Sequence, residues 1–407
     1  MALAAGAALR LSFPADIEWK ADEQWTFLHA QAMAAGGAWP TAGMASSVGA
    51  PNPGLSLWAF AALFELFGVR QPPDLARAVQ TLNVLALVAF AAFTLLAIPR
   101  SRREPWLWAA ALWAVNPVAV ILERKIWPPS LLPLAMVALL WAWRFRRQPA
   151  AAAAWGALGA LMAQIHLGAA FLALAVAGWT LAADRARFPW RSWLIGAALG
   201  AAPALPWLMA MLHGGGAHLA PRLLPRIGFF PRWATQMFGF GPDYTLGRAA
   251  FADYLTGPRL GGSASYLMAA AQLALAALLL ATLAGAVARL RREGWPSARS
   301  VFLGDSPETR LIAAALWGYG GLLTMITFAG AGAYRHYLIV VTPIMALWSA
   351  MAVLWSQAGR ARARVLLASM CLLQAAMSAQ LLVYIDQRGV IPGEFGASWK
   401  AQQAARG

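Results

Sequence analysis

The chain has 407 residues, of which 60% are hydrophobic and only 12% are charged. A soluble domain usually carries about a quarter charged residues, so this composition excludes an ordinary water-soluble globular protein. The net charge of +16 is compatible with a nucleic-acid-binding protein or with a membrane protein that has basic cytoplasmic loops. The single cysteine, Cys371, excludes an intramolecular disulfide and a cysteine metal cluster.

Apolar runs of the length that crosses a bilayer, or nearly that length, recur along the chain. From residue 77 onward they cover 78–98, 105–122, 131–143, 150–165, 167–183, 192–212, 262–288, 310–330, 338–356 and 365–384. Residues 1–14 are apolar but too short to span, and we expect them to be part of a first transmembrane helix with a truncated start. The sequence therefore predicts an all-α, polytopic integral membrane protein of about 10–11 transmembrane helices.

Alternate loops between these runs are strongly basic. They cover residues 99–105, 144–149, 184–191, 289–310 and 359–364, and they hold 17 of the 32 Lys and Arg residues. Short basic loops mark the cytoplasmic side, so the other loops are expected on the periplasmic side of a bacterial inner membrane. Because no basic stretch alternates with stacking aromatics, the charge reflects topology, and the expected partner is the lipid bilayer rather than nucleic acid.

This topology divides the chain into regions with different expected roles. Residues 15–76 form a first periplasmic loop with two interfacial helices, and residues 77–212 form transmembrane helices joined by short outer loops. Residues 213–261 form a long periplasmic loop. Residues 262–384 form the C-terminal transmembrane helices, and 385–407 form a periplasmic tail. Because the spans are apolar scaffold, the chemistry is expected in the outer segments.

The first candidate for chemistry lies in ADEQWTFLHAQAM, residues 21–33. Its apolar residues have helical spacing, and Asp22 and Glu23 fall in the first turn, where carboxylates complement the helix dipole. A second short helix is expected at 55–69. A carboxylate at a membrane surface can act as a general base when burial and neighbours tune its pKa. The alternative is that both carboxylates face water and only start the helix.

A charged triplet in another outer loop is a candidate phosphate site. Glu123, Arg124 and Lys125 precede two prolines, and basic residues on this side run against the positive-inside bias. An Arg fork and a Lys point charge suit a phosphate oxyanion. The alternative is that both basic side chains simply snorkel to the interface.

Two turns between spans contain histidine. Tyr334, Arg335 and His336 share one turn, where anion binding and an ordinary aromatic belt are both open interpretations. His166 lies in the other turn, where a hydrogen-bonded turn histidine is the alternative to a substrate contact.

Several classes of site are not indicated. The sequence contains no P-loop, dinucleotide fingerprint or HExxH motif, which argues against an ATP-driven pump. The spans lack interior charged residues, which argues against an ion-coupled transporter. His213 and His218 provide too few ligands for zinc, so no metal site is predicted, although dependence on a divalent metal stays open.

The order of these elements resembles the GT-C superfamily of membrane glycosyltransferases. It is most similar to bacterial relatives of the dolichyl-phosphate-mannose protein mannosyltransferases (glycosyltransferase family 39) and to the aminoarabinose transferase of lipid A. ADEQWTFLHAQAM resembles the acidic pair that opens an interfacial helix in these families, and APNPGLSLWAFAALFELFGV resembles the Pro-Pro-Leu helix that follows. The match continues through ERKIWPPSLLP, MAQIHLGAA and YRHYLIVVTP, covering roughly residues 10–345.

The resemblance implies transfer of a sugar from a polyprenyl-phosphate carrier to a periplasmic lipid, glycan or protein acceptor. It also implies that Asp22 is the catalytic base, that Glu23 orients or tunes it, and that the attack inverts the anomeric carbon. The polyprenyl-phosphate sugar is the donor substrate, and no cofactor is certain.

The sequence departs from the family pattern where many relatives hold the phosphate. They place a Lys before the Pro-Pro-Leu helix, whereas this chain has Asn52. The phosphate contact is therefore expected to move to Arg124, Lys125 or Arg335. The remaining candidates for the substrate site are Glu123, His166, His336, Tyr334 and Asn52.

Two other functions stay open. A transporter or flippase of lipid-linked glycans would need a polar path through the spans and would work without Asp22. A structural partner in an envelope complex would tolerate neutralisation of the outer charges.

Overall fold

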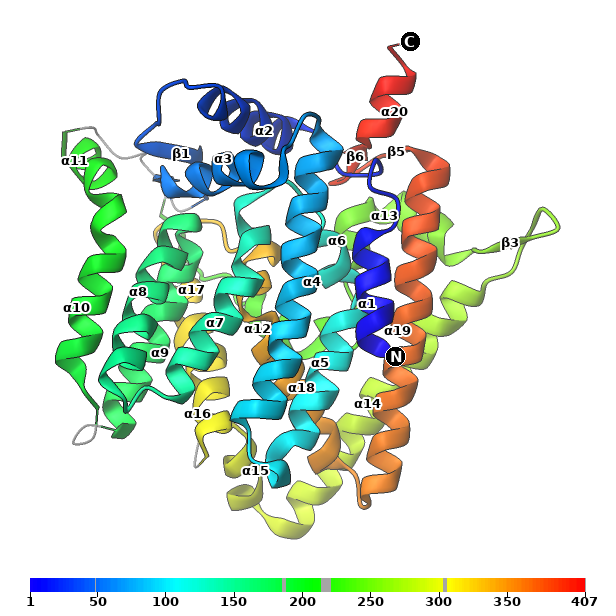
Figure 1. The fold of residues 1–407 in the computed structure, drawn as a ribbon. Helices are drawn as coiled ribbons and strands as arrows, with labels where there is room; N and C mark the ends of the chain where they lie inside the picture. The colour runs from blue at the N-terminus through cyan, green and yellow to red at the C-terminus, as the bar shows by residue number, and fades with distance from the viewer. Residues whose placement is uncertain (48, 185–187, 214–220, 303–305, 407) are drawn as a thin grey trace.

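The computed structural model describes residues 1–47, 49–184, 188–213, 221–302 and 306–406. This part of the chain is a helical bundle with three two-stranded antiparallel hairpins (Figure 1). Most helices run along the long axis of the bundle, whereas α2 (Ala21–Ala34) and α3 (Leu55–Phe67) lie across its upper end in Figure 1. We call this upper end the capped end.

Within the described residues, six helical segments are long and apolar enough to cross a membrane. They are Pro72–Ala97, Trp190–His213, Leu267–Glu293, Pro307–Ile326, Arg335–Ser356 and Arg360–Arg388. Four shorter apolar helices accompany them, at Ala2–Leu11, Leu55–Phe67, Pro149–Ile165 and Gly168–Asp184. The chain is thus a multi-pass, all-α membrane protein, as the composition predicts.

The helices that make up the bundle carry these labels in Figure 1. They are α1 (Ala2–Leu11), α4 (Pro72–Ala97), α5 (Arg103–Val115), α6 (Pro117–Leu122), α7 (Leu132–Arg144), α8 (Pro149–Ile165), α9 (Gly168–Asp184), α10 (Trp190–Ala201), α11 (Leu205–His213), α14 (Leu267–Glu293), α16 (Pro307–Ala313), α17 (Gly320–Ile326), α18 (Thr342–Ser356) and α19 (Arg360–Arg388). The π-helical segment η4 (Ala314–Tyr319) joins α16 to α17, and the 3-10 segment η3 (Ala202–Ala204) joins α10 to α11.

The remaining elements lie in the connections. The helical ones are η1 (Arg100–Arg102), η2 (Pro128–Leu131), α12 (Phe229–Gln236), α13 (Pro242–Leu255), α15 (Trp295–Phe302), η5 (Arg335–Val341) and α20 (Trp399–Ala404). The hairpins are β1 (Ala42–Ala45) with β2 (Pro51–Pro53), β3 (Arg259–Leu260) with β4 (Ser263–Ala264), and β5 (Val390–Ile391) with β6 (Gly396–Ala397). Segment 213–261, expected as a loop, therefore includes the helices α12 and α13.

The apolar run 105–122, predicted as one span, is divided into α5 and α6. Pro117 lacks the N–H that a continuous helix needs, and Asn116 caps the new helix by accepting the Ala119 N–H at 3.1 Å. The Asn116 amide also donates to the carbonyl of Gln236 and to Oε1 of Gln374, both at 2.8 Å. The break thus places α6 against α12 and α19 through a buried polar contact.

A small second core holds the capped end together. Its buried residues come from the segment before α2, from α2, α3 and the start of α4, and from residues 126–131, and they include Phe27, Phe60, Phe64, Val79 and Ile126. The ring centroids of Phe27 and Phe64 lie 5.2 Å apart. Burial of each large apolar side chain contributes about 1.5–3 kcal/mol, so this core fixes α2 on the bundle.

The C-terminal segment folds back onto the segment before α2. The Trp399 N–H donates to the Ile17 carbonyl at 3.0 Å, and the Lys400 N–H donates to the Ala15 carbonyl at 3.1 Å. These two bonds join the segment just before α2 to the start of α20, almost 400 residues later in the sequence.

Candidate active site

A partly enclosed cavity with a mixed polar and apolar lining lies at the capped end, between the start of α2 and the turns that follow β1, α6, α8 and α17. Its volume is about 170 Å³. The lining includes five of the predicted site residues together with two serines, a tryptophan and two prolines: Asp22, Asn52, His166, Tyr334, His336, Ser46, Ser47, Trp127, Pro128 and Pro129. The structure thus brings together residues from four separate predicted segments.

Asp22 lies in the first turn of α2, where the exposed N–H groups of the helix favour a negative charge. Its side chain is half-buried and faces the cavity. No ion pair or side-chain hydrogen bond involves the Asp22 carboxylate within the described residues. The carboxylate is therefore available to accept a proton from a hydroxyl in the cavity.

Glu23 lies next to Asp22 but is completely buried. Its Oε1 is 3.1 Å from Nζ of Lys125, which also pairs with Oε2 of Glu18 at 2.9 Å. Burial raises the pKa of Glu23 to about 7, with a further rise from the Glu18 charge and an opposing effect of Lys125. Burial lowers the pKa of Lys125, but the two carboxylates outweigh this effect and raise it.

Lys125 also contacts the cavity wall. Its Nζ lies 4.4 Å from the ring centroid of Trp127, a cation–π distance. The Trp127 ring is edge-on to His336, with centroids 4.6 Å apart. Lys125 therefore connects Glu23 on α2 to the aromatic side of the cavity.

Two histidines continue the wall beyond Trp127. The rings of His166 and His336 are perpendicular, with centroids 5.6 Å apart. Burial lowers the pKa of His166 to about 4, so this side chain is neutral near pH 7. Its Nδ1 accepts the Gly168 N–H at 3.1 Å, which places the ring proton on Nε2. His166 is thus a neutral donor.

Backbone hydrogen bonds fix the polar side of the cavity. Oδ1 of Asn52 accepts the Leu167 N–H at 3.0 Å, and its amide donates to the Met44 carbonyl at 3.1 Å. The hydroxyl of Ser47 donates to the Gly332 carbonyl at 2.9 Å. Asn52 therefore ties the β1–β2 hairpin to the turn between α8 and α9.

The structure places Glu123 and Arg124 outside the cavity lining. Glu123 is fully buried, pairs with Arg10 of α1 at 2.5 Å and accepts the Trp113 indole N–H at 2.7 Å. The Arg124 guanidinium donates to four backbone carbonyl oxygens, those of Leu9, Arg10, Ser12 and Phe13, at 2.6–2.9 Å. Both side chains hold the end of α1.

Arg335 has a different environment. Its Nη1 is 3.3 Å from the Phe240 carbonyl, and its guanidinium lies 5.8 Å from the Tyr244 ring centroid. Arg232 of α12 donates to the Ala333 carbonyl, two residues before Arg335, at 3.3 Å. Among the described residues, no carboxylate lies within ion-pair distance of either guanidinium. Asp243 acts on Arg335 from beyond ion-pair distance, so the two half-buried cations keep a net positive charge that suits an anionic ligand.

Sequence reasoning missed Arg232 and Glu18. Arg232 lies in a segment whose helix could not be placed against the Tyr334 turn from periodicity alone. Glu18 lies just before α2, and only the three-dimensional structure shows that it shares Lys125 with Glu23.

The described residues contain no group of three or more His, Cys, Asp or Glu side chains that could hold a metal ion. His213 ends α11, with Nδ1 2.7 Å from the Met209 carbonyl. His218 lies outside the described residues.

Comparison with known proteins defines the class of fold. No protein-family model matches the chain, and no curated protein sequence matches it significantly. The fold is similar to that of one solved membrane protein, which confirms the predicted fold class of an all-α, multi-pass membrane protein. A similar solved structure is the crystal structure of ArnT from Cupriavidus metallidurans bound to undecaprenyl phosphate. The TM-score is 0.52 at 12% identity, covering 94% of this chain and 76% of that one.

Proposed function

We propose that the protein is a membrane glycosyltransferase that transfers a sugar from a polyprenyl-phosphate carrier to an acceptor hydroxyl. The observation that carries this proposal is the position of Asp22, a carboxylate without an ion-pair partner among the described residues, which lines a partly enclosed cavity. The fold adds support, because the similar ArnT structure contains undecaprenyl phosphate. The acceptor is a lipid, a glycan or a protein.

Asp22 acts as the general base in this proposal. The acceptor oxygen attacks the anomeric carbon of the sugar while its proton passes to the Asp22 carboxylate. The bond between that carbon and the phosphate oxygen breaks on the opposite face, and the electron pair leaves with the polyprenyl phosphate. The configuration at the anomeric carbon is therefore inverted. Glu23, held by Lys125, fixes the first turn of α2 in which Asp22 lies.

Arg335 is the proposed partner of the departing phosphate, together with Arg232. Preorganised cations near developing negative charge are commonly the largest electrostatic contribution to such reactions. Lys125 keeps one N–H free of its two carboxylates and is a further candidate. We assign no phosphate to Arg124, because its guanidinium is already bonded to four carbonyls.

The cavity wall offers partners for the hydroxyl groups of a sugar. His166 presents a neutral ring, and His336, Tyr334 and Trp127 present aromatic surfaces beside it. Because the basic loops mark the cytoplasmic side, we place the cavity on the periplasmic side of a bacterial inner membrane.

Mass spectrometry of lipid-linked sugars tests the proposal. Cells without the protein should accumulate one polyprenyl-phosphate sugar, and cells that express it should convert this donor into polyprenyl phosphate and a glycosylated product. If the total donor is unchanged and only its side of the membrane differs, the protein moves the lipid and is not a transferase.

A further inference from the structure

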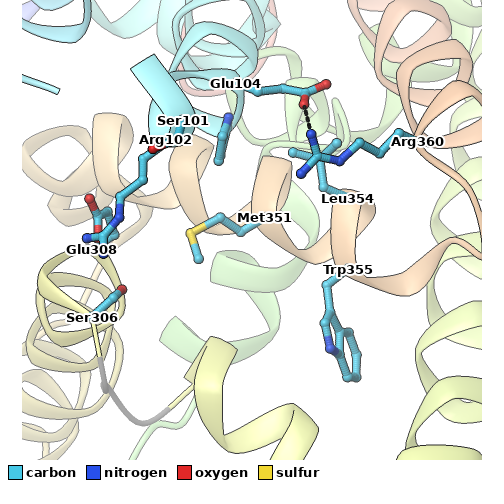
Figure 2. A pocket seen from close by; sticks show the side chains of 10 residues that line it. Ser101, Arg102, Glu104, Ser306, Glu308, Met351, Leu354, Trp355 and Arg360 are labelled. Carbon is cyan, nitrogen blue, oxygen red and sulfur yellow. Dashed lines mark hydrogen bonds and ion pairs between the residues drawn. The ribbon is translucent and has the colours of Figure 1, made fainter. Parts of the chain in front are cut away.

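Two hollows lie at the arginine-rich end of the bundle, which is opposite the capped end and includes the start of α5 and of α19. The first hollow, about 400 Å³, lies between the starts of α5, α16 and α19 and the end of α18 (Figure 2). The second, about 650 Å³, lies between the end of α4, the start of α5 and the start of α19. Glu104 lines both.

The charges around the first hollow are compensated. Arg102 pairs with Glu308 at 3.5 Å, and Arg360 pairs with Glu104 at 3.4 Å. Figure 2 shows the Arg360–Glu104 pair above Met351 and Leu354. This hollow therefore has no unpaired positive charge for an anionic ligand.

The charges around the second hollow are not compensated. Three arginines and one glutamate line it: Arg100, Arg103, Arg364 and Glu104. Glu104 accepts a hydrogen bond from Nε of Arg364 at 2.6 Å. Arg103 donates from Nε to the Ile98 carbonyl at 2.8 Å and has no carboxylate partner among the described residues. Arg100 is exposed and makes no hydrogen bond or ion pair within that same set.

The rest of the second hollow is apolar. Leu95 and Leu107 are 49% and 45% exposed, and Trp108 and Ala111 lie beside them. The candidate membrane span of α4 ends at Ala97, three residues before Arg100. The apolar wall therefore lies at membrane depth, while the arginines lie at its boundary, where Trp108 is a typical interfacial residue.

We propose that this second hollow binds one anionic phospholipid from the membrane leaflet at the arginine-rich end. The phosphodiester lies between Arg100 and Arg103, and an acyl chain follows Leu95 and Leu107. Charge complementarity selects the ligand, because a basic pocket beside transmembrane helices attracts anionic headgroups. A zwitterionic phospholipid has no net charge to match the two uncompensated guanidinium groups.

Native mass spectrometry of the purified full chain, titrated with phosphatidylglycerol or phosphatidylethanolamine of the same acyl chains, tests this site. We expect one tightly bound phosphatidylglycerol and weaker binding of phosphatidylethanolamine. Replacing both Arg100 and Arg103 with glutamine should weaken phosphatidylglycerol binding roughly thirtyfold, since each basic residue near a surface contributes about a factor of five. The matched control replaces the exposed Arg291 and Arg292 of α14 with glutamine, which removes the same charge outside the hollow.

If the Arg291 and Arg292 control weakens phosphatidylglycerol binding equally, the lipid is held by diffuse surface charge, and the proposed site is wrong. Equal binding of the two lipids, or unchanged binding in the double variant, would also overturn it. Replacement of Arg103 removes a hydrogen bond to the backbone and could disturb folding. Arg100→Gln alone is therefore the second variant, and it should weaken phosphatidylglycerol binding about fivefold. Gel-filtration profiles of all variants confirm that they are folded.

Discussion

Asp22 and Glu23 are neighbours in the sequence, but they have different surroundings. Asp22 faces the cavity without an ion-pair partner among the described residues, whereas Glu23 is buried against Lys125. The two carboxylates therefore divide the work expected of an acidic pair, one accessible to substrate and the other holding the helix. The same division separates Arg335, which lacks a carboxylate partner in that part of the chain, from Arg124, which is bonded to backbone.

Arg335→Gln tests the proposed phosphate contact. A hydrogen bond to a charged group contributes about 1.5–3 kcal/mol, so binding of undecaprenyl phosphate to the purified protein should weaken about 10- to 150-fold. Arg70→Gln is the matched control, because Arg70 is exposed at the capped end between α3 and α4. Titration followed by native mass spectrometry measures both. Equal binding by the two variants would remove Arg335 from the site.

Glu23→Gln tests the buried pair through the pH dependence of stability. The pKa of Glu23 is raised from 4.5 to about 7, so the folded protein keeps a proton that the unfolded chain loses between these values. Stability from this group therefore falls as the pH rises from about 4.5 to about 7, by up to about 3 kcal/mol. The melting temperature of Glu23→Gln minus that of the unchanged protein should therefore be larger at pH 8 than at pH 5.

That comparison removes the contribution of His166, which is present in both proteins, and reports on Glu23 together with Glu18 and Lys125, the two groups that interact with it. His166, whose pKa is lowered to about 4, acts in the opposite direction and loses stability as the pH falls below about 6.5. A melting-temperature difference that does not change with pH would contradict the raised pKa of Glu23.

At the scale of elements, the approach of α13 to η5 determines where Arg335 lies. Gly241 precedes α13 with φ of +124°, and a Cβ there would overlap Nη1 of Arg335. A residue other than glycine would therefore have to displace the guanidinium. The backbone conformation of Gly241 therefore leaves the space that the Arg335 guanidinium occupies.

Gly241→Ala should consequently weaken undecaprenyl phosphate binding about as much as Arg335→Gln does. Gly68→Ala is the control, since Gly68 ends α3 with φ of +59° and a Cβ there meets nothing within 4 Å. Gly68→Ala should lose about 1–2 kcal/mol of stability from its left-handed backbone, and Gly241→Ala should lose about 1–3 kcal/mol from its more strained one, but only Gly241→Ala should lose binding. Similar affinity of the two variants for undecaprenyl phosphate would show that Gly241 does not determine the position of Arg335.

Helices that follow from a local sequence pattern could be predicted from the sequence, whereas the contacts between them could not. The acidic start and helical spacing of residues 21–33 predict α2, which the structure places at Ala21–Ala34. The ion pair between Arg10 and Glu123 joins residues 113 positions apart, and no local periodicity encodes it. Asn116 and Pro117 carry a local signal for a helix start, but the hydrophobicity of 105–122 concealed it. The cavity itself depends on long-range packing of turns, so its members could only be proposed singly.

At the scale of the whole molecule, the charge distribution and the fold agree. In Figure 1 the basic connections from α4 to α5 and from α18 to α19 lie at the end opposite α2 and α3. The capped end contains the cavity, and the arginine-rich end contains the two hollows, of which Figure 2 shows the first. This distribution of charge supports the proposed orientation in the membrane.

Labelling of single cysteines tests this orientation. Cys371 is buried, so Cys371→Ser provides a background for His29→Cys on α2 and Arg362→Cys on α19, both exposed sites. A membrane-impermeant maleimide added to intact spheroplasts should label position 29 and leave position 362 unlabelled. Labelling of both positions, or of position 362 alone, would contradict the proposed topology.

Donor turnover by the Asp22→Asn variant is the most direct measurement of the proposed function. A general base contributes about 100- to 10,000-fold, so conversion of the accumulating polyprenyl-phosphate sugar should fall by that factor in membranes with equal amounts of protein. Undecaprenyl phosphate binding should be retained, because Asp22 does not hold the phosphate. Glu65→Gln, which removes an exposed carboxylate of α3 at the same end, should keep full turnover. Turnover by Asp22→Asn at the level of the unchanged protein would contradict the role of Asp22 as the base.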